Sequence, residues 1–356
     1  MSLLFLLPLL LPVPTARASQ QDAPTLESPL DNSAVEAGAG DPTLLAGSLR
    51  IDRGADRLPI WIPPGEELVF QVVLDLGKLG SLDVGSVTLA SGVERYVPGL
   101  AGQREDTAQE LKVGWLRGSA SGGYLGYELD HEITTRINPQ AWPRTILRDT
   151  QRGSENRRRE LLLGWRDGAA VSSYRRDVHC QGCRRREHFV ESSLPWSDEH
   201  HCDKCRRAEH RVWREGSERA VPEAAIDMLG AVYLARTFMR SGESDARLDM
   251  VETDRLWDVT LRRGKRRSIK TRAGVFSSSE ILLHSSVPAG EEHTEREFAG
   301  LFGIRGELHL WMQDPTGVPV LIEGELPVGD LFDLKVSVVL KEHSGTPQAF
   351  ARLSGR

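Results

Sequence analysis

The chain has 356 residues, with 39% hydrophobic residues, 27% charged residues and a formal net charge of −6. This length allows a full hydrophobic core, and the composition is that of a globular protein. The mildly acidic balance excludes a protein whose whole surface is devoted to nucleic acid. Four cysteines are too few for a disulfide-dense scaffold but are the right number for one metal site.

Residues 1–18 have the pattern of a signal peptide. A Leu-rich run ends in Ala16-Arg17-Ala18, which is the small-x-small pattern found before a cleavage site. The run is shorter than the ~20 residues that cross a bilayer, although no Lys or Arg precedes it. A buried N-terminal core segment is the alternative. The pattern predicts export to the periplasm or cell envelope, with a mature chain that begins at Ser19.

Residues 19–57 are expected to form a flexible linker, because they are rich in Ala, Gly, Pro, Asp and Glu and lack an apolar period. A β-rich domain is expected over residues 58–356. Asp167-Gly168 is a strong hairpin turn signal. Strand patterns occur over residues 68–76, 82–89, 111–116, 124–133, 159–165, 170–175, 248–251, 256–261, 281–284, 307–312, 318–326 and 331–340.

One helix is predicted after the signal peptide, from Pro222 to Met239. Its apolar residues recur at helical spacing, Pro222 suits a first helical position, and Ser241-Gly242 ends the pattern. In the last strand, Leu334, Val336, Val338 and Leu340 alternate with more polar neighbours, which is typical of a sheet with one solvated face. The predicted fold is therefore mainly β: a curved antiparallel sheet (a β-roll or half-barrel) with one packed helix.

The four cysteines are predicted to bind one structural zinc ion. Cys180, Cys183, Cys202 and Cys205 form two Cys-x-x-Cys pairs separated by 18 residues, a spacing typical of a four-thiolate site. Each pair lies in a copy of the pattern His-Cys-x-x-Cys-Arg-Arg-x-Glu-His, so residues 179–210 resemble a duplicated zinc knuckle inserted into the β domain. Each turn can supply one edge of a tetrahedron.

Two other interpretations of the cysteines remain open. Disulfides would suit an oxidising compartment, and a redox-active Cys-x-x-Cys is the third possibility. The flanking histidines are expected to lie outside the ligand set. Mass spectrometry and the sulfur–sulfur distances distinguish these alternatives.

Three basic runs could form an anion-binding face. They lie at residues 157–159, 184–186 and 262–267. Interleaved carboxylates favour an ion-paired, solvated surface instead. If these runs bind a partner, anionic envelope polymer or lipid headgroups fit an exported protein better than nucleic acid. Common enzyme motifs are absent from the sequence, and Asp130-His131-Glu132 is explained more simply as strand residues than as a metal or acid–base site.

Three stretches resemble the bacterial family known as domain of unknown function 3108. They are the β segment that begins Gly65-Glu-Glu-Leu-Val-Phe, the helix from Ala225 to Arg236, and the segment Gly306-Glu-Leu-His-Leu-Trp-Met. The resemblance covers residues 65–340 and implies an envelope protein with a curved antiparallel sheet. It carries over no catalytic residues, and the twin Cys-x-x-Cys segment departs from the family pattern.

Together these features predict an exported, non-enzymatic binding or structural protein braced by a structural zinc site. The alternative is an envelope hydrolase or ligand carrier with its site inside the curved sheet. A large apolar pocket would favour the alternative, and a filled interior would favour the first prediction.

Overall fold

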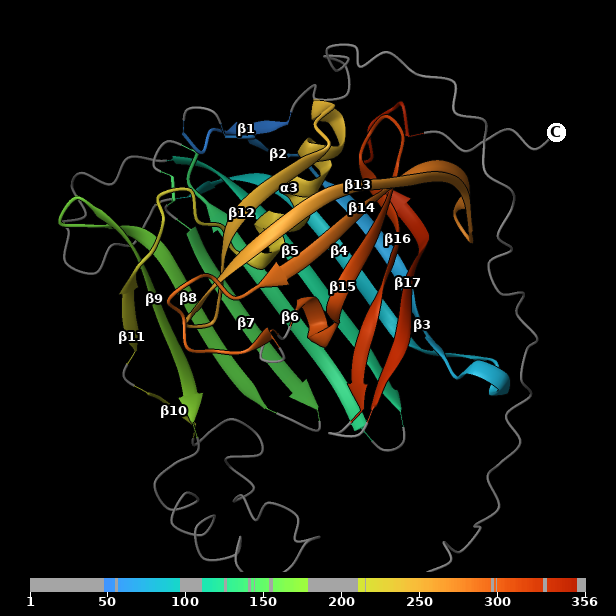
Figure 1. Cartoon of the computed structure of the whole chain (residues 1–356), viewed down its shortest axis with the longest axis horizontal. Coiled ribbons are helices and arrows are strands. Elements are labelled where there is room, and N and C mark those ends of the chain that lie inside the picture. The colour runs from blue at the N-terminus through green and yellow to red at the C-terminus, as the bar shows by residue number, and fades with distance from the viewer. Residues whose placement is uncertain are drawn as a thin grey trace, which may run out of the picture.

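A computed structural model gives the architecture of the chain (Figure 1). It describes residues 48–54, 57–96, 111–124, 127–139, 142–143, 145–153, 156–178, 211–214, 216–295, 298, 300–328 and 332–350. Residues 1–18, the expected signal peptide, and residues 179–210, the expected zinc-knuckle insert, lie outside these ranges.

A single large antiparallel sheet of 15 strands organises the described residues. Its strands follow one another in the order β10-β9-β8-β7-β6-β5-β4-β3-β17-β16-β15-β14-β13-β12, and β11 also pairs with β9. The bounds are β3 Glu66–Asp75, β4 Ser81–Tyr96, β5 Leu111–Tyr124, β6 Tyr127–Ile137, β7 Thr145–Gly153, β8 Arg157–Arg166, β9 Ala169–Val178, β10 Val212–Trp213, β11 Ser217–Ala220, β12 Asp245–Glu252, β13 Arg255–Thr271, β14 Gly274–Ser286, β15 Arg305–Gln313, β16 Val318–Val328 and β17 Phe332–Ser344.

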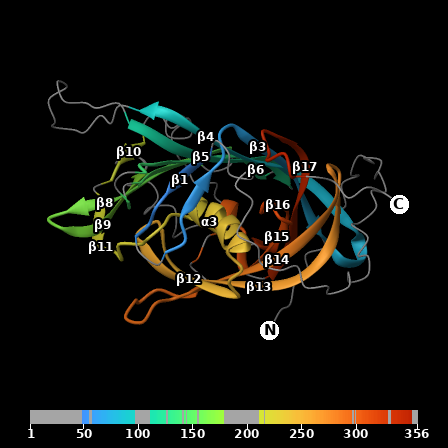
Figure 2. The same cartoon turned by 90° about the horizontal axis from the view of Figure 1, so that it is seen from above.

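The sheet curls around one α-helix, α3 (Met228–Ser241), as the view from above shows (Figure 2). The helix contacts β12, β13 and β14 on one side and β5 and β6 on the other. Its apolar residues join one continuous core with the inner face of the sheet, including Phe70, Trp257 and Phe276. The predicted class, a curved antiparallel sheet with one packed helix, is confirmed. The sheet is not a closed barrel, because β12 and β10 are separate ends of the strand order.

Most predicted strands are present, and several run longer than predicted. In β17, Val336, Val338 and Leu340 are buried while Lys335 and Lys341 are exposed, which confirms the predicted alternation. Strand β7 was not predicted, nor were β10 and β11, each of four residues or fewer. In β7 the inward positions include Asp149 and Gln151, so no apolar period marks the strand.

A further two-stranded sheet lies within and next to the expected linker. β1 (Leu49–Ile51) pairs with β2 (Ile60–Ile62), and Ile51 is fully buried. Residues 49–51 therefore belong to the folded domain rather than to a linker. The β2 strand packs against α3, and Ile51, Ile60 and Ile62 belong to the main hydrophobic core.

The predicted start of the helix at Pro222 is wrong by six residues, because α3 begins at Met228. Pro222 instead forms a turn with Ala225, and Ile226 makes a parallel bridge to Met250 of β12. The side chain of Asp227 then accepts a hydrogen bond from the backbone N–H of Gly230 at 2.9 Å. Asp227 is thus the N-cap, and it satisfies one of the free N–H groups of the first turn.

The Asp227 carboxyl gives the fold a specific pH dependence. Burial raises its pKa to about 6, against the smaller opposing effect of hydrogen bonds from Gly230 and Thr135. An unfolded Asp titrates near 3.9, so the folded state binds the proton more tightly. We expect the free energy of unfolding to fall by about 3 kcal/mol as pH rises from about 4 to about 6. Urea unfolding of the parent and of Asp227→Asn, which keeps a good cap, measures the difference. Identical pH profiles for the two proteins would contradict this assignment.

Two hairpin turns place non-glycine residues at positive φ. In Asp167-Gly168, both residues have positive φ, 51° and 81°, which matches the predicted two-residue turn between β8 and β9. In the turn between β12 and β13, Thr253 has a φ of 58°. A β-branched residue in this region is strained, and such strain costs roughly 1–3 kcal/mol.

We expect Thr253→Gly to raise the free energy of unfolding by about 1 kcal/mol, because glycine adopts this φ without strain. The matched opposite change is Gly168→Ala at a φ of 81°, where an added Cβ would meet nothing within 4 Å. We expect that variant to lose about 1 kcal/mol through backbone strain alone. Chemical denaturation measures both, and a destabilised Thr253→Gly variant would show that the turn is not strained.

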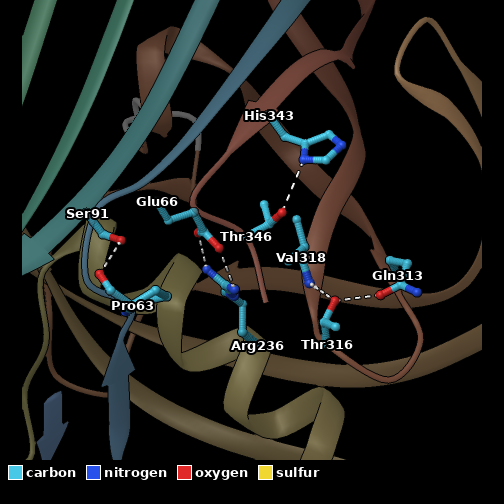
Figure 3. Close-up of polar contacts among 9 residues, drawn as sticks. All are labelled: Pro63, Glu66, Ser91, Arg236, Gln313, Thr316, Val318, His343 and Thr346. Carbon is cyan, nitrogen blue, oxygen red and sulfur yellow. Dashed lines mark hydrogen bonds and ion pairs between the residues drawn. The ribbon is translucent and has the colours of Figure 1, made fainter. Parts of the chain in front are cut away.

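The helix is joined to the sheet by a buried ion pair. The Arg236 guanidinium faces the Glu66 carboxylate from β3, with N–O distances of 2.5 and 3.1 Å (Figure 3). Both side chains are nearly or fully buried. The Arg236 guanidinium also lies over the ring of Tyr233, 5.3 Å from its centroid. The neighbouring hydrogen bonds in Figure 3 link turn residues to one another, so this cluster is a structural network that holds α3 inside the sheet.

Candidate anion-binding site

The inner face of the sheet changes from apolar to polar toward one end of β6–β9. Strand register places Ile133, Asp149, Arg159 and Arg176 in one row across these strands. The next row contains His131, Gln151 and Arg157. In contrast, Leu161 and Leu163 line the opposite end of β8 and are buried. Side chains of the polar rows therefore face into the concave side of the sheet.

A buried histidine–carboxylate pair lies in these rows. His131 Nε2 and Asp149 Oδ1 are 2.8 Å apart, and both side chains are about 90% or more buried. The His131 ring also meets the edge of Phe302, with ring centroids 5.4 Å apart. The second carboxylate oxygen of Asp149 lies 3.8 Å from Arg159. Burial alone would raise the pKa of Asp149, but the His131 hydrogen bond and nearby arginines hold it below its usual value.

His131 was expected to be an ordinary strand residue, grouped with Asp130 and Glu132. The structure separates these three side chains, because His131 is buried while Asp130 and Glu132 are exposed. Asp149, the actual partner of His131, comes from β7, which is the strand that the sequence did not reveal. The pair places the second oxygen of the Asp149 carboxylate within ion-pair distance of Arg159, 3.8 Å away.

Arg159 opens onto a cavity of about 590 Å³ between the β9–β11 edge and the β12–β13 turn. This volume lies within the usual range for small-molecule sites. Eleven residues line it: Arg159, Tyr174, Arg175, Arg176, Arg214, Gly216, Ser217, Glu252, Thr253, Asp254 and Arg255. Five of them are arginines and two are acidic, so the lining carries a net positive charge.

The arginines of this cavity differ in their partners. Arg175 donates to Glu160 at 2.6 Å, and Arg159 is the neighbour of Asp149. Arg176 and Arg214 form no ion pair with any other residue that the structure describes, and both are exposed. Their backbones are joined, since the N–H of Arg214 donates to the carbonyl of Arg176 at 2.9 Å. Two guanidinium groups without an ion-pair partner among the described residues therefore lie at one rim of the cavity, one on β9 and one directly after β10.

Hydroxyl groups complete the lining. Burial raises the pKa of Tyr174 above its ordinary value, although Arg159 and Arg176 act in the opposite direction, so its hydroxyl keeps its proton and can donate. The strained Thr253 lies on the facing turn, and its hydroxyl donates to the carbonyl of Glu252 at 2.5 Å. Backbone strain of this kind is concentrated at functional sites. Arginines with the Tyr174 hydroxyl beside them form a site suited to a phosphate or carboxylate group.

The predicted zinc ligands Cys180, Cys183, Cys202 and Cys205 lie outside the described residues. The structure does describe both ends of the segment that contains them. Val178 of β9 pairs with Val212 of β10, and Arg211 forms an ion pair with the buried Asp177 at 3.0 Å. Residues 179–210 therefore leave and rejoin the sheet at one point, beside the cavity. Within the described residues, no group of three or more His, Cys, Asp or Glu side chains is placed to hold a metal.

The basic run at residues 262–267 lies in β13 and is engaged within the fold. Arg263 donates to the carbonyls of Phe238 and Met239 at the end of α3, at 2.8 and 2.5 Å. Arg266 pairs with Asp314 at 2.9 Å. Arg267 likewise pairs with Glu323 at 3.3 Å. The expected ion pairing is therefore present at Arg266 and Arg267, whereas Arg263 binds backbone carbonyls instead. In the run at 157–159, strand alternation places Arg158 on one face of the sheet and Arg157 and Arg159 on the other. The run at 184–186 lies outside the described residues.

Comparisons with known proteins give no family assignment. No family model matches the chain, and no curated protein matches it. A β-barrel-like protein of domain of unknown function 1849 from Brucella abortus aligns with a TM-score of 0.45 and 9% identity, over 80% of this chain and 98% of that one. A putative exported protein with a YmcC-like fold from Bacteroides fragilis aligns with a TM-score of 0.28 and 10% identity, over 80% of this chain and 99% of that one.

The resemblance to domain of unknown function 3108 stays a prediction. None of the helices in the described part of the chain combines the length and the hydropathy that a bilayer span requires.

Proposed function

We propose that this chain is an exported protein of the cell envelope that binds an anionic ligand in the arginine-lined cavity, without catalysing a reaction. The domain is braced by a structural zinc ion on Cys180, Cys183, Cys202 and Cys205. The signal-like pattern of residues 1–18 supports export, and the duplicated Cys-x-x-Cys spacing supports zinc.

The observation that carries this proposal is the charge of the cavity. Five arginines and two carboxylates line about 590 Å³, and Arg176 and Arg214 have no carboxylate partner among the described residues. The two exposed guanidinium groups repel each other weakly across water, and an anion bound between them would replace that repulsion with attraction. Charge-assisted hydrogen bonds from Arg to phosphate or carboxylate are among the strongest available to a protein.

The filled interior favours this site over one deep inside the curled sheet. Helix α3 occupies the concave space, and its side chains from Leu229 to Met239 are almost all buried. A carrier or hydrolase with an internal apolar pocket needs that volume. The cavity at the sheet edge is lined instead by charged and hydroxyl side chains, which suits an anion rather than an apolar cargo.

Calorimetric titration of the mature protein with pyrophosphate tests the proposal. We expect saturable binding that weakens with added salt. Replacing Arg176 or Arg214 by Ser should reduce the affinity about tenfold or more for each change, since a charged hydrogen bond contributes about 1.5–3 kcal/mol.

The matched control is Arg247→Ser, an exposed arginine of β12 outside the cavity lining. Its affinity should equal that of the parent. Absence of binding in the parent protein, or equal losses in Arg176→Ser and Arg247→Ser, would refute the anion site.

A further inference from the structure

Exposed large hydrophobic side chains are concentrated at one edge of the sheet. Of the described residues, four large hydrophobics are strongly exposed, and all lie in β8 or β10. Leu162 is 37% exposed, Val212 50% and Trp213 40%. The fourth, Trp165, lies toward the other end of β8 and donates from its Nε1 to the carbonyl of Trp142 at 2.8 Å. Strand alternation places Val212 and Trp165 on the inner face of the sheet and Leu162 and Trp213 on the outer face, so only the last two lie on the face that carries Arg148, Arg158 and Arg175.

Arginines surround Trp213 on the outer face of the sheet. The guanidinium of Arg175 lies 4.6 Å from the Trp213 ring centroid, and that of Arg158 lies 5.2 Å from it. Trp213 pairs in register with Asp177, and Arg175 pairs with Glu160. The strand alternation places these residues on the face opposite to the polar inner rows. We call Arg148, Arg158, Leu162, Arg175 and Trp213 the outer-face patch.

The outer-face patch carries excess positive charge. Glu160 is shared by Arg148 at 3.2 Å and Arg175 at 2.6 Å. Asp177 is shared by Arg158 and Arg211, each at 3.0 Å. Both carboxylates are buried while Arg148, Arg158 and Arg175 are far more exposed. Among the described residues, two carboxylates are thus shared by four arginines, and the exposed Arg148, Arg158 and Arg175 present positive charge to solvent on the face that carries Trp213 and Leu162.

We propose that the outer-face patch binds the surface of an anionic lipid membrane. Trp prefers the headgroup level of a bilayer, where its ring is partly buried and its N–H remains hydrated. Nearby arginines attract anionic headgroups, and Leu162 adds apolar area that can enter the interface. The whole chain has a net charge of −6, so general electrostatics oppose its approach to an anionic membrane. Attraction therefore has to come from a local surface such as this one.

A lipid surface fits better than a single-stranded nucleic acid. Nucleic-acid platforms need aromatic faces that are free to stack on bases. At Trp213, the guanidinium groups of Arg158 and Arg175 already lie over the ring and would compete with a base for stacking on it. This proposal goes beyond anion binding in the cavity, because Trp213, Leu162 and Arg158 do not line the cavity. Arg175 is the one member of the outer-face patch that also lines it.

Vesicle co-sedimentation of the full mature chain tests the proposal. Vesicles of phosphatidylglycerol mixed with phosphatidylcholine should bind the parent protein, and vesicles of phosphatidylcholine alone should not. Trp213→Ser should reduce the partition coefficient roughly tenfold or more, because the apolar area of an indole leaves the interface. The control Trp165→Ser removes a Trp outside the patch that is slightly more exposed than Trp213, and this variant should bind as the parent does.

Pyrophosphate affinity of the same variants separates the two proposals. If Trp213→Ser loses vesicle binding and keeps its pyrophosphate affinity, the outer-face patch is a lipid surface distinct from the cavity. Vesicle binding that is equal in the parent and in Trp213→Ser would overturn the inference, whatever the pyrophosphate result. The inference would also be overturned if the protein bound a single-stranded oligonucleotide instead of vesicles and Trp213→Ser abolished that binding. Failure of pyrophosphate binding with Trp213-dependent vesicle binding would overturn the cavity proposal and leave this one standing.

Discussion

We expect Glu66→Ala to lower the free energy of unfolding by about 3–5 kcal/mol, because it leaves the charge of Arg236 buried and unpaired. Arg236 lies within α3, and its guanidinium joins the helix to β3 through this pair (Figure 3). Breaking the pair therefore weakens the attachment of the helix to the sheet. Urea unfolding followed by circular dichroism measures the effect.

The control is an exposed pair at the N-terminal end of the domain. Arg50 and Asp52 lie 2.7 Å apart, with both side chains more than half exposed. Asp52→Ala should cost less than about 1 kcal/mol, since water screens such pairs. The double change Glu66→Leu with Arg236→Met should recover part of the loss, because it removes both buried charges together. A similar cost for Glu66→Ala and Asp52→Ala would show that the buried pair does not hold the helix.

Loss of zinc from Cys183→Ser is the second large effect that we expect. The mature parent should carry one zinc ion per chain in native mass spectrometry, and Cys183→Ser should carry almost none, because three thiolates bind the ion far less tightly. X-ray absorption fine structure at the zinc edge should give zinc–sulfur distances of about 2.3 Å. The β domain should remain folded, since Val178 and Val212 pair and Asp177 binds Arg211 at the base of the segment.

His188→Ala and His210→Ala are the matched controls for the ligand set. Both should retain zinc if the four cysteines are the ligands, whereas loss of zinc from one of them would indicate a site of three cysteines and one histidine. A parent chain without metal, lighter by two hydrogens for each bond formed, would contain disulfides instead. Intact thiols without zinc at stoichiometric metal would remove the site altogether.

The fold was largely predictable because its strands follow a simple rule. Wherever one face packs on the core, apolar residues alternate with polar ones, as in β17 with Val336, Val338 and Leu340. Asp167-Gly168 marked its hairpin for a local reason, since both residues adopt positive φ. The helix start was misplaced because Pro222 suits a turn as well as a first helical position, and here it forms a turn. The bridge from Ile226 to Met250 keeps the backbone extended at residue 226, so the helix begins only at Met228.

The cavity was not predictable, because its residues come from strands that meet only after folding. Strand β7 escaped detection for the same reason that it matters: Asp149 and Gln151 replace apolar residues on its inner face. In the run at 157–159, alternation sends Arg158 to Asp177 on the outer face and Arg159 to Asp149 on the inner face. A sequence pattern of three arginines contains no information about which of them is compensated by a distant carboxylate.

Arginine side-chain resonances of the mature protein, recorded during a titration with pyrophosphate, test the anion site most directly. In a protein labelled with ¹⁵N-arginine, the Nε–Hε signals of Arg159, Arg176 and Arg214 should shift together and saturate with one dissociation constant, assigned through the single Ser variants. The signal of Arg247 should stay unchanged. Small shifts of all arginines that grow with ionic strength and never saturate would contradict the account, because the cavity would then hold no specific anion.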